Sequence, residues 1–155
     1  MLIADTHCHV GTNWYEPVET LLYLMAANGV DKALLVQGVK MCIYDNSYLI
    51  ESIRRYPGRF SAIGKVDTDR SDAPDQLEQL VKQGIEGVRL KPMMRSPGTD
   101  PLAIWRKAAQ LGIPVSVQGA AEQIISAEFR EVITSFPTLN LIIEHLGNCG
   151  SDTAP

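Results

Sequence analysis

The stretch Asn28–Val36, NGVDKALLV, joins the end of a helix to the start of a strand. Gly29 can adopt the left-handed conformation that ends a helix, and the apolar run after it is typical of a buried strand. The same device recurs in QGIEGVRL (83–90) and in LGIPVSV (111–117), each with its own glycine. The repetition predicts a chain built from successive units of helix, tight turn and strand.

Working outward from these turns, apolar strands recur about every 25–30 residues, the length of one βα unit. The predicted strands are Leu2–Asp5, Lys32–Val36, Phe60–Val66, Gly87–Lys91, Pro114–Gln118 and Leu139–His145. Strict alternation of strand and helix predicts a parallel sheet with right-handed crossovers. Because no glycine-rich phosphate loop follows the first strand, a doubly wound sheet is disfavoured. We predict an α/β fold of the (β/α)8 TIM-barrel type, with about six of the eight βα units in this chain.

The composition is that of an ordinary globular protein, with 45% hydrophobic and 21% charged residues. We expect residues 1–155 to form a single, incomplete barrel domain with a loose tail at 149–155. The net charge of −4 argues against a nucleic-acid partner, and the lack of a long apolar run argues against a membrane. No basic segment precedes the short N-terminal apolar run, so no signal peptide is expected. Three cysteines without CxxC spacing indicate buried thiols in a reducing cytoplasm.

Polar side chains gather where the predicted strands end. In strand order they are Asp5, His7 and His9, then Gln37, then Lys65 and Asp67, then Arg89 and Lys91, then Gln118, and finally Glu144 and His145. Functional groups of parallel α/β folds lie at the carboxyl ends of the strands, so this asymmetry predicts an active site there. Lys65 and Asp67 are expected to pair with each other. Trp14 and Tyr15, in the loop after the first strand, form either a pocket wall or a cover for the core.

His7 and His9 are two residues apart in DTHCH (5–9), so in an extended chain both imidazoles point to one side and Cys8 to the other. Two neutral imidazoles on one strand can share a divalent metal. His145, the third histidine of the chain, falls at the end of the sixth predicted strand, and we expect it to reach the same cavity. The alternative is a set of hydrogen-bonded core histidines, but one strand rarely buries two imidazoles side by side.

The DTHCH motif resembles the HxH signature of the amidohydrolase superfamily. Three further blocks are similar to the third, fourth and sixth strand regions of its amidohydrolase-related branch. They are YPGRFSAIGKVD (56–67), GIEGVRLKP (84–92) and FPTLNLIIEHLGN (136–148). The resemblance runs from residue 2 to about residue 148 and implies a metal-dependent (β/α)8 enzyme. The branch includes lactonases and metal-dependent carboxylate decarboxylases.

By this resemblance, His7 and His9 bind a divalent metal, zinc or alternatively manganese, and His145 is a catalytic histidine. Many relatives have a metal-ligating histidine after the fifth strand, where this chain has Gln118. An amide oxygen is a poorer zinc ligand than imidazole, so a metal-free mechanism stays open and Gln118 is expected to contact substrate. Arg89 and Lys91 are expected to anchor a substrate carboxylate, for which arginine offers a bidentate fork. A solvated rim charge is the alternative for Lys91.

These interpretations predict a lactonase-like hydrolase that attacks a small carboxylate-bearing lactone, or a related ester or amide, with activated water. A decarboxylase of the same branch is the first alternative, and Gln118 weighs against it. A phosphoesterase or DNase would need further metal ligands, and the acidic charge does not favour DNA. An inactive, truncated product is the remaining alternative.

Six strands cannot close an eight-stranded barrel, so the first and sixth strands are expected to expose apolar edges. The edge residues are Leu2, Ile3, Leu141, Ile142 and Ile143. The relatives use an aspartate after an eighth strand as general base, and no eighth strand is expected in this chain. We therefore expect the chain on its own to self-associate, for example as a homo-oligomer, and to show no appreciable hydrolysis.

Overall fold

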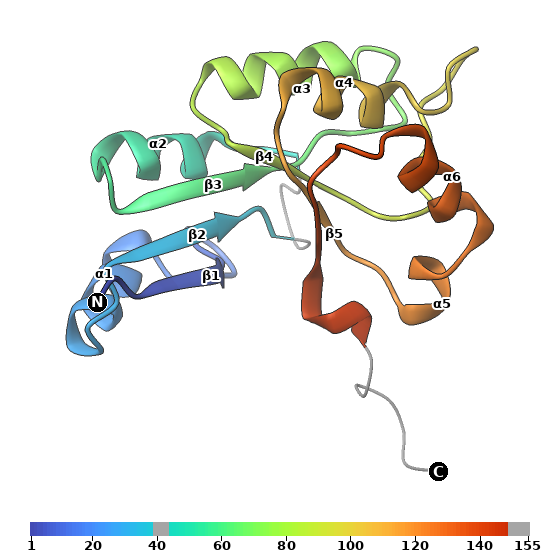
Figure 1. Ribbon diagram of the computed structural model, residues 1–155. Helices are drawn as coiled ribbons and strands as arrows, with labels where there is room; N and C mark the ends of the chain where they lie inside the picture. The colour runs from blue at the N-terminus through green and yellow to red at the C-terminus, as the bar shows by residue number, and fades with distance from the viewer. Residues whose placement is uncertain (39–43, 149–155) are drawn as a thin grey trace. The chain divides into compact units, whose positions relative to one another are not determined.

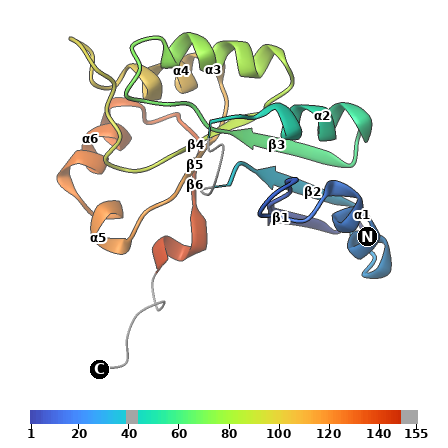
Figure 2. The same cartoon turned by 180° about the vertical axis from the view of Figure 1, so that it is seen from behind.

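The computed structural model describes residues 1–38 and 44–148, which fall into two compact units. The N-terminal unit consists of Met1–Lys65 with Leu80–Glu86, and the C-terminal unit of Val66–Gln79 with the chain from Gly87 onward. Figure 1 shows the strands and helices of each unit, and Figure 2 shows the same elements from behind. Among the described residues, none of the helices has the length and apolarity needed to cross a membrane.

Three parallel strands form the sheet of the N-terminal unit. They are β1 (Ala4–Cys8), β2 (Lys32–Val36) and β3 (Phe60–Gly64). The middle strand, β2, pairs with both of the others (Figure 1). Helix α1 (Val18–Ala27) connects the first two strands and helix α2 (Ser47–Arg55) the next two. This is the alternation of strand and helix that the sequence predicts.

The core of this unit lies between one face of the sheet and the helices. Alternate strand residues, among them Cys8, Leu35 and Ala62, belong to one buried cluster with residues of both helices. Helix α1 contributes Val18 and Met25, whereas Leu21 and Leu22 are partly buried and pack against the cluster. Because strand side chains alternate between faces, the residues between these core positions lie on the other face of the sheet.

The C-terminal unit also contains three parallel strands, with β5 in the middle. The strands are β4 (Gly87–Leu90), β5 (Val115–Val117) and β6 (Leu141–Ile143). The helices are α3 (Ala73–Lys82), whose last turn belongs to the N-terminal unit, α4 (Ala103–Leu111), α5 (Ala121–Ile124), α6 (Ala127–Ser135) and the short η1 (Glu144–Asn148). Trp105 and Phe129 are fully buried here, with ring centroids 6.1 Å apart.

The turn from helix to strand that the sequence predicts is confirmed in all three places. Gly29, Gly84 and Gly112 have φ angles of 67°, 106° and 66°, in the region that side chains other than glycine rarely adopt. Gly112 is the C-cap of α4, and β5 begins three residues later.

All predicted strands are present, but their bounds shift for physical reasons. The first strand runs on to Cys8 instead of ending at Asp5. The third ends at Gly64, because the side-chain amide of Asn46 hydrogen-bonds both the N–H and the carbonyl of Lys65, at 2.8 and 2.9 Å. The sixth covers only three residues, because the chain turns at Glu144.

The two outer strands expose apolar side chains, as predicted. Among the described residues, β1 pairs only with β2, and β6 only with β5. Leu2, Ile3, Ile142 and Ile143 are 69%, 40%, 45% and 38% exposed, whereas Leu141 is partly buried. Of the three cysteines, Cys8 is a buried free thiol, and Cys42 and Cys149 lie outside the described residues, as does the tail at 149–155.

Candidate active site

A β-bulge lies in β1 between Asp5 and Cys8, the segment that includes His7. Asp5 lies opposite Ala33 and Cys8 lies opposite Leu35, so three steps along β1 match two steps along β2. The Asp5 carboxylate accepts a hydrogen bond from the His7 N–H at 3.0 Å, which supports the bulged backbone. Bulges re-aim the side chains that follow them, and they are common beside active sites. The sequence pattern alone does not indicate this role of Asp5.

Cys8 faces the helices and belongs to the buried core cluster. Burial, with a hydrogen bond and negative charge from Asp5, raises the pKa of its thiol to about 12. The thiol is therefore neutral and acts as a small apolar side chain, as predicted. Because Cys8 points into the core, its neighbours His7 and His9 point to the opposite face of the sheet, and the predicted shared orientation of the two imidazoles is confirmed.

The two imidazoles meet edge to face, with Nε2 of His7 and Nε2 of His9 3.3 Å apart. Nδ1 of His9 lies 2.7 Å from the Val36 carbonyl oxygen. A carbonyl can only accept, so Nδ1 carries a proton and Nε2 is the acceptor nitrogen of the neutral His9 ring. The Tyr15 ring packs against the His9 ring, with ring centroids 4.7 Å apart. Both histidines are partly buried.

This geometry fits a tetrahedral metal ion. At the zinc–imidazole bond length of 2.0–2.1 Å, two nitrogens 3.3 Å apart subtend an angle of about 107° at the metal, close to the tetrahedral value. Metal-binding histidines usually donate their other ring N–H to a carbonyl or carboxylate, as His9 does to Val36. The pair can therefore supply two neutral ligands to one divalent ion.

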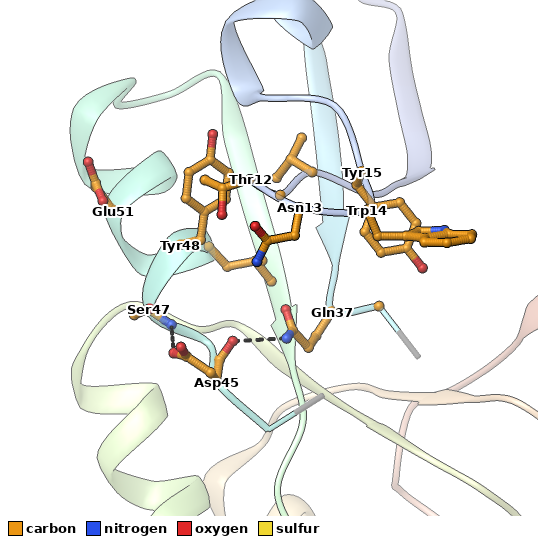
Figure 3. Close-up of a pocket in the computed structure, with 13 residues that line it drawn as sticks. Thr12, Asn13, Trp14, Tyr15, Gln37, Asp45, Ser47, Tyr48 and Glu51 are labelled. Carbon is orange, nitrogen blue, oxygen red and sulfur yellow. Dashed lines mark hydrogen bonds between the residues drawn. The ribbon is translucent and has the colours of Figure 1, made fainter. Parts of the chain in front are cut away.

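A cavity of about 200 Å³ opens beside the loop that follows β1. Figure 3 shows Trp14 and Tyr15 on one side of the cavity and Tyr48 on the other. Its floor includes Gln37, whose amide donates to the Asp45 carbonyl at 2.9 Å. Tyr15 thus contacts both this cavity and the His9 ring. Of the two roles left open for Trp14 and Tyr15, the structure supports the pocket wall.

In the C-terminal unit, Arg89 is buried and holds a carboxylate of the chain itself. Its Nε donates to Glu144 Oε1 at 2.9 Å, and its Nη2 donates to Oε2 at 2.5 Å. The Ser116 hydroxyl donates to Oε1 at 2.5 Å. The sequence predicts Glu144 only as a strand-end residue and does not indicate a role for Ser116. No local pattern marks the pair, because 55 residues separate Arg89 from Glu144.

The remaining predicted residues lie at strand ends as expected, and their roles stay predictions. Lys91 directly follows β4 and is exposed, and Gln118 directly follows β5 and is partly buried. His145 lies two residues after β6, with its side chain 52% exposed and its backbone in the left-handed region. The predicted strand extends to His145, which is wrong, because β6 ends at Ile143 and the chain turns at Glu144.

A sequence profile of amidohydrolases matches residues 5–153. The chain belongs to the amidohydrolase family. A sequence search of curated proteins gives no match to this amidohydrolase.

Three solved bacterial structures have a similar fold. A probable 2-pyrone-4,6-dicarboxylic acid hydrolase from Acinetobacter baumannii, with citric acid bound, is 21% identical, with a TM-score of 0.75 over 95% of this chain and 59% of that one. A candidate 2-pyrone-4,6-dicarboxylic acid hydrolase from Pseudomonas putida is 22% identical, with a TM-score of 0.73 over 94% and 57%. An amidohydrolase from Burkholderia multivorans with bound zinc is 16% identical, with a TM-score of 0.68 over 95% and 58%.

These neighbours are (β/α)8 barrels, so the predicted fold class is confirmed. The amidohydrolase chain spans less than 60% of the length of each of these three. Its βα units correspond to part of such a barrel, and its family is one of hydrolases.

Proposed function

We propose that this amidohydrolase hydrolyses a small carboxylate-bearing lactone, or a related ester or amide, with a divalent metal held by His7 and His9. The observation that carries the proposal is the approach of the two Nε2 atoms to 3.3 Å, with Nδ1 of His9 held by Val36. Zinc is the first choice because it suits imidazole ligands, and manganese is the alternative. The metal would polarise a substrate carbonyl and lower the pKa of a bound water.

The fixed orientation of the imidazoles is the contribution of the chain to metal binding. The Val36 carbonyl holds the His9 ring and its tautomer, and the bulge supported by Asp5 directs His7 toward His9. A preorganised pair loses little entropy when it binds an ion. His145 is proposed as the catalytic histidine that steadies the negative charge developing on the carbonyl oxygen.

Substrate binding is assigned to polar residues at the strand ends. Lys91 and Gln118 directly follow β4 and β5, and exposed Lys91 can meet a substrate carboxylate directly. Arg89 is also proposed for this role, with its Nε and Nη2 paired to Glu144 in the structure. Two of the similar structures are described as hydrolases of 2-pyrone-4,6-dicarboxylic acid, a lactone with two carboxylates, which supports this substrate class. A small molecule is the proposed partner, and a reducing, cytoplasmic location is proposed from the cysteine spacing of the sequence.

The test combines metal loading with a substrate panel. The chain is stripped with a chelator, reloaded with zinc or manganese, and assayed on lactones with and without a carboxylate and on a matched set of carboxylic acids. We expect the metal to bind at one site, and any hydrolysis to require it and to favour the carboxylate-bearing lactones. Decarboxylation of the acids without lactone hydrolysis would contradict the proposal, as would hydrolysis that survives complete metal removal.

A further inference from the structure

The pairing of Arg89, Ser116 and Glu144 follows from the strand register of the C-terminal unit. Arg89 lies opposite Ser116, and Ser116 lies opposite Ile142, two residues before Glu144. Residues that pair across parallel strands point to the same face, so the three polar side chains converge on one face of this sheet. Arg89, Ser116 and Glu144 are 3%, 2% and 4% exposed. The network therefore joins all three strands of the unit inside a buried region.

Such a network is not needed for stability alone. Taking two charges out of water opposes folding, and buried ion pairs can often be replaced by apolar residues of similar volume without loss of stability. A buried, fully hydrogen-bonded carboxylate does, however, fix the position of its own backbone closely. The fixed carboxylate therefore holds in place the backbone directly after Glu144.

The chain directly after Glu144 follows an unfavourable path. His145 and Leu146 have φ angles of 50° and 52°, and Gly147 has 67°. Side chains other than glycine rarely adopt this left-handed region, because Cβ crowds the backbone. Two such residues in succession persist only where surrounding contacts hold them. The Glu144 carboxylate, held by Arg89 and Ser116, provides such a contact at the first step of the turn.

We propose that Glu144 is a positioning residue for His145, with Arg89 and Ser116 holding its carboxylate. The inference rests on the proposed function, in which His145 is the catalytic histidine. Nε2 of His145 lies 3.9 Å from Glu144 Oε2, beyond hydrogen-bond distance, and the His145 side chain is 52% exposed. Glu144 acts through the backbone: it sets where the left-handed turn begins, and thereby where the His145 imidazole points.

Nitrogen NMR of the histidine-labelled full chain tests this role directly. The chain has three histidines, and the variant His145→Gln assigns the His145 ring signals. The double variant Arg89→Met with Glu144→Leu replaces the ion pair with apolar side chains of similar size. We expect it to stay folded, with the His145 ring signals shifted and broadened. Unchanged His145 signals in the folded double variant would overturn the proposal.

The milder variant Ser116→Ala decides the question if the double variant does not fold. It removes one hydrogen bond to Glu144 and leaves the ion pair. We expect a smaller shift of the same His145 signals, and no shift in a folded variant would overturn the proposal. Asp100→Asn is the matched control. It disrupts the ion pair between Arg106 and Asp100 in the same unit, and the side chains of that pair are 50% and 43% exposed. A His145 shift as large in this control would also overturn it.

The NMR result does not depend on activity, so the two proposals can fail separately. If the wild-type chain binds no metal and shows no hydrolysis while the His145 signals still shift in the variants of Arg89, Ser116 and Glu144, that combination contradicts only the proposed function. Hydrolysis by the wild type with His145 signals that do not respond contradicts only the positioning role. Where hydrolysis is measured, Ser116→Ala is expected to lower kcat and to leave KM unchanged, and a change in KM alone would contradict positioning.

Discussion

Nε2 of His7 and Nε2 of His9 lie 3.3 Å apart on the face of β1 that is turned away from the core. Cys8, between them, points into the core, and the Asp5 carboxylate supports the bulge that begins this arrangement. The paired imidazoles thus result from one short segment, DTHCH, together with the carbonyl that β2 offers to His9. Each of these contacts can be removed separately.

Asp5→Ala is expected to weaken metal binding as well as stability. The change removes the hydrogen bond to the His7 N–H and costs about 1 kcal/mol of unfolding free energy. It also frees the bulge, so zinc affinity should fall by roughly 10–100-fold, as when an orienting contact of a metal ligand is lost. Asp31→Ala is the control, because Asp31 likewise accepts from a backbone N–H, that of Ile3 at 2.8 Å. Equal zinc affinities in the two variants would contradict the role of the bulge.

Gly38→Ala is expected to displace Tyr15 from the His9 ring. A Cβ at residue 38 would lie 2.3 Å from Tyr15 Cε2, so the ring must move, at a cost of about 1–3 kcal/mol. Gly11→Ala is the matched control, because its Cβ would meet the same tyrosine at an ordinary 3.5 Å. Urea unfolding measures the free energy of unfolding of both variants. Similar stability of the two variants would show that Tyr15 is not held at this place.

The exposed strand edges are expected to drive self-association. Ile3→Lys with Ile142→Lys places one charge directly before β1 and one on β6, and charged edge residues oppose strand pairing between molecules. Sedimentation velocity should show a shift from associated species toward monomer. Ile133→Lys is the control, because Ile133 is 44% exposed on helix α6 and Ile142 is 45% exposed on β6. If the helix variant has the same effect, association does not depend on the strand edges.

In a form of the enzyme that hydrolyses lactones, Lys91→Ala is expected to raise KM for carboxylate-bearing lactones by about 2–5-fold, the range of an exposed ion pair. Neutral lactones lack the carboxylate, so their KM should not change. Lys32→Ala, at the amino end of β2, is the control for the loss of one exposed positive charge. An equal rise in KM on charged and neutral substrates would assign Lys91 a structural role instead.

The features predicted correctly from the sequence are those set by local chemistry. Gly29, Gly84 and Gly112 end their helices because few other residues tolerate a positive φ. The shared face of His7 and His9 follows from the period of two in a strand. In both cases the deciding residues are neighbours in the chain, so the sequence pattern contains the necessary information.

The features that were missed depend on residues far apart in the chain. Arg89 and Glu144 come within hydrogen-bond distance only when β4, β5 and β6 have paired in register. The left-handed path at His145 and Leu146 is uncommon for residues other than glycine, so the local sequence does not indicate it. The bulge after Asp5 is likewise defined by the pairing of β1 with β2, which the sequence of β1 alone does not contain.

Zinc titration of the metal-free chain by isothermal calorimetry tests the central claim most directly. We predict one zinc ion per chain, with the affinity reduced about tenfold or more in both His7→Gln and His9→Gln, because each removes one imidazole ligand. Asp31→Ala, which removes an exposed carboxylate that accepts from the Ile3 N–H, is the control and should leave the affinity unchanged. Zinc binding that persists with wild-type affinity in His7→Gln and His9→Gln, or a chain that binds no zinc, would contradict the account.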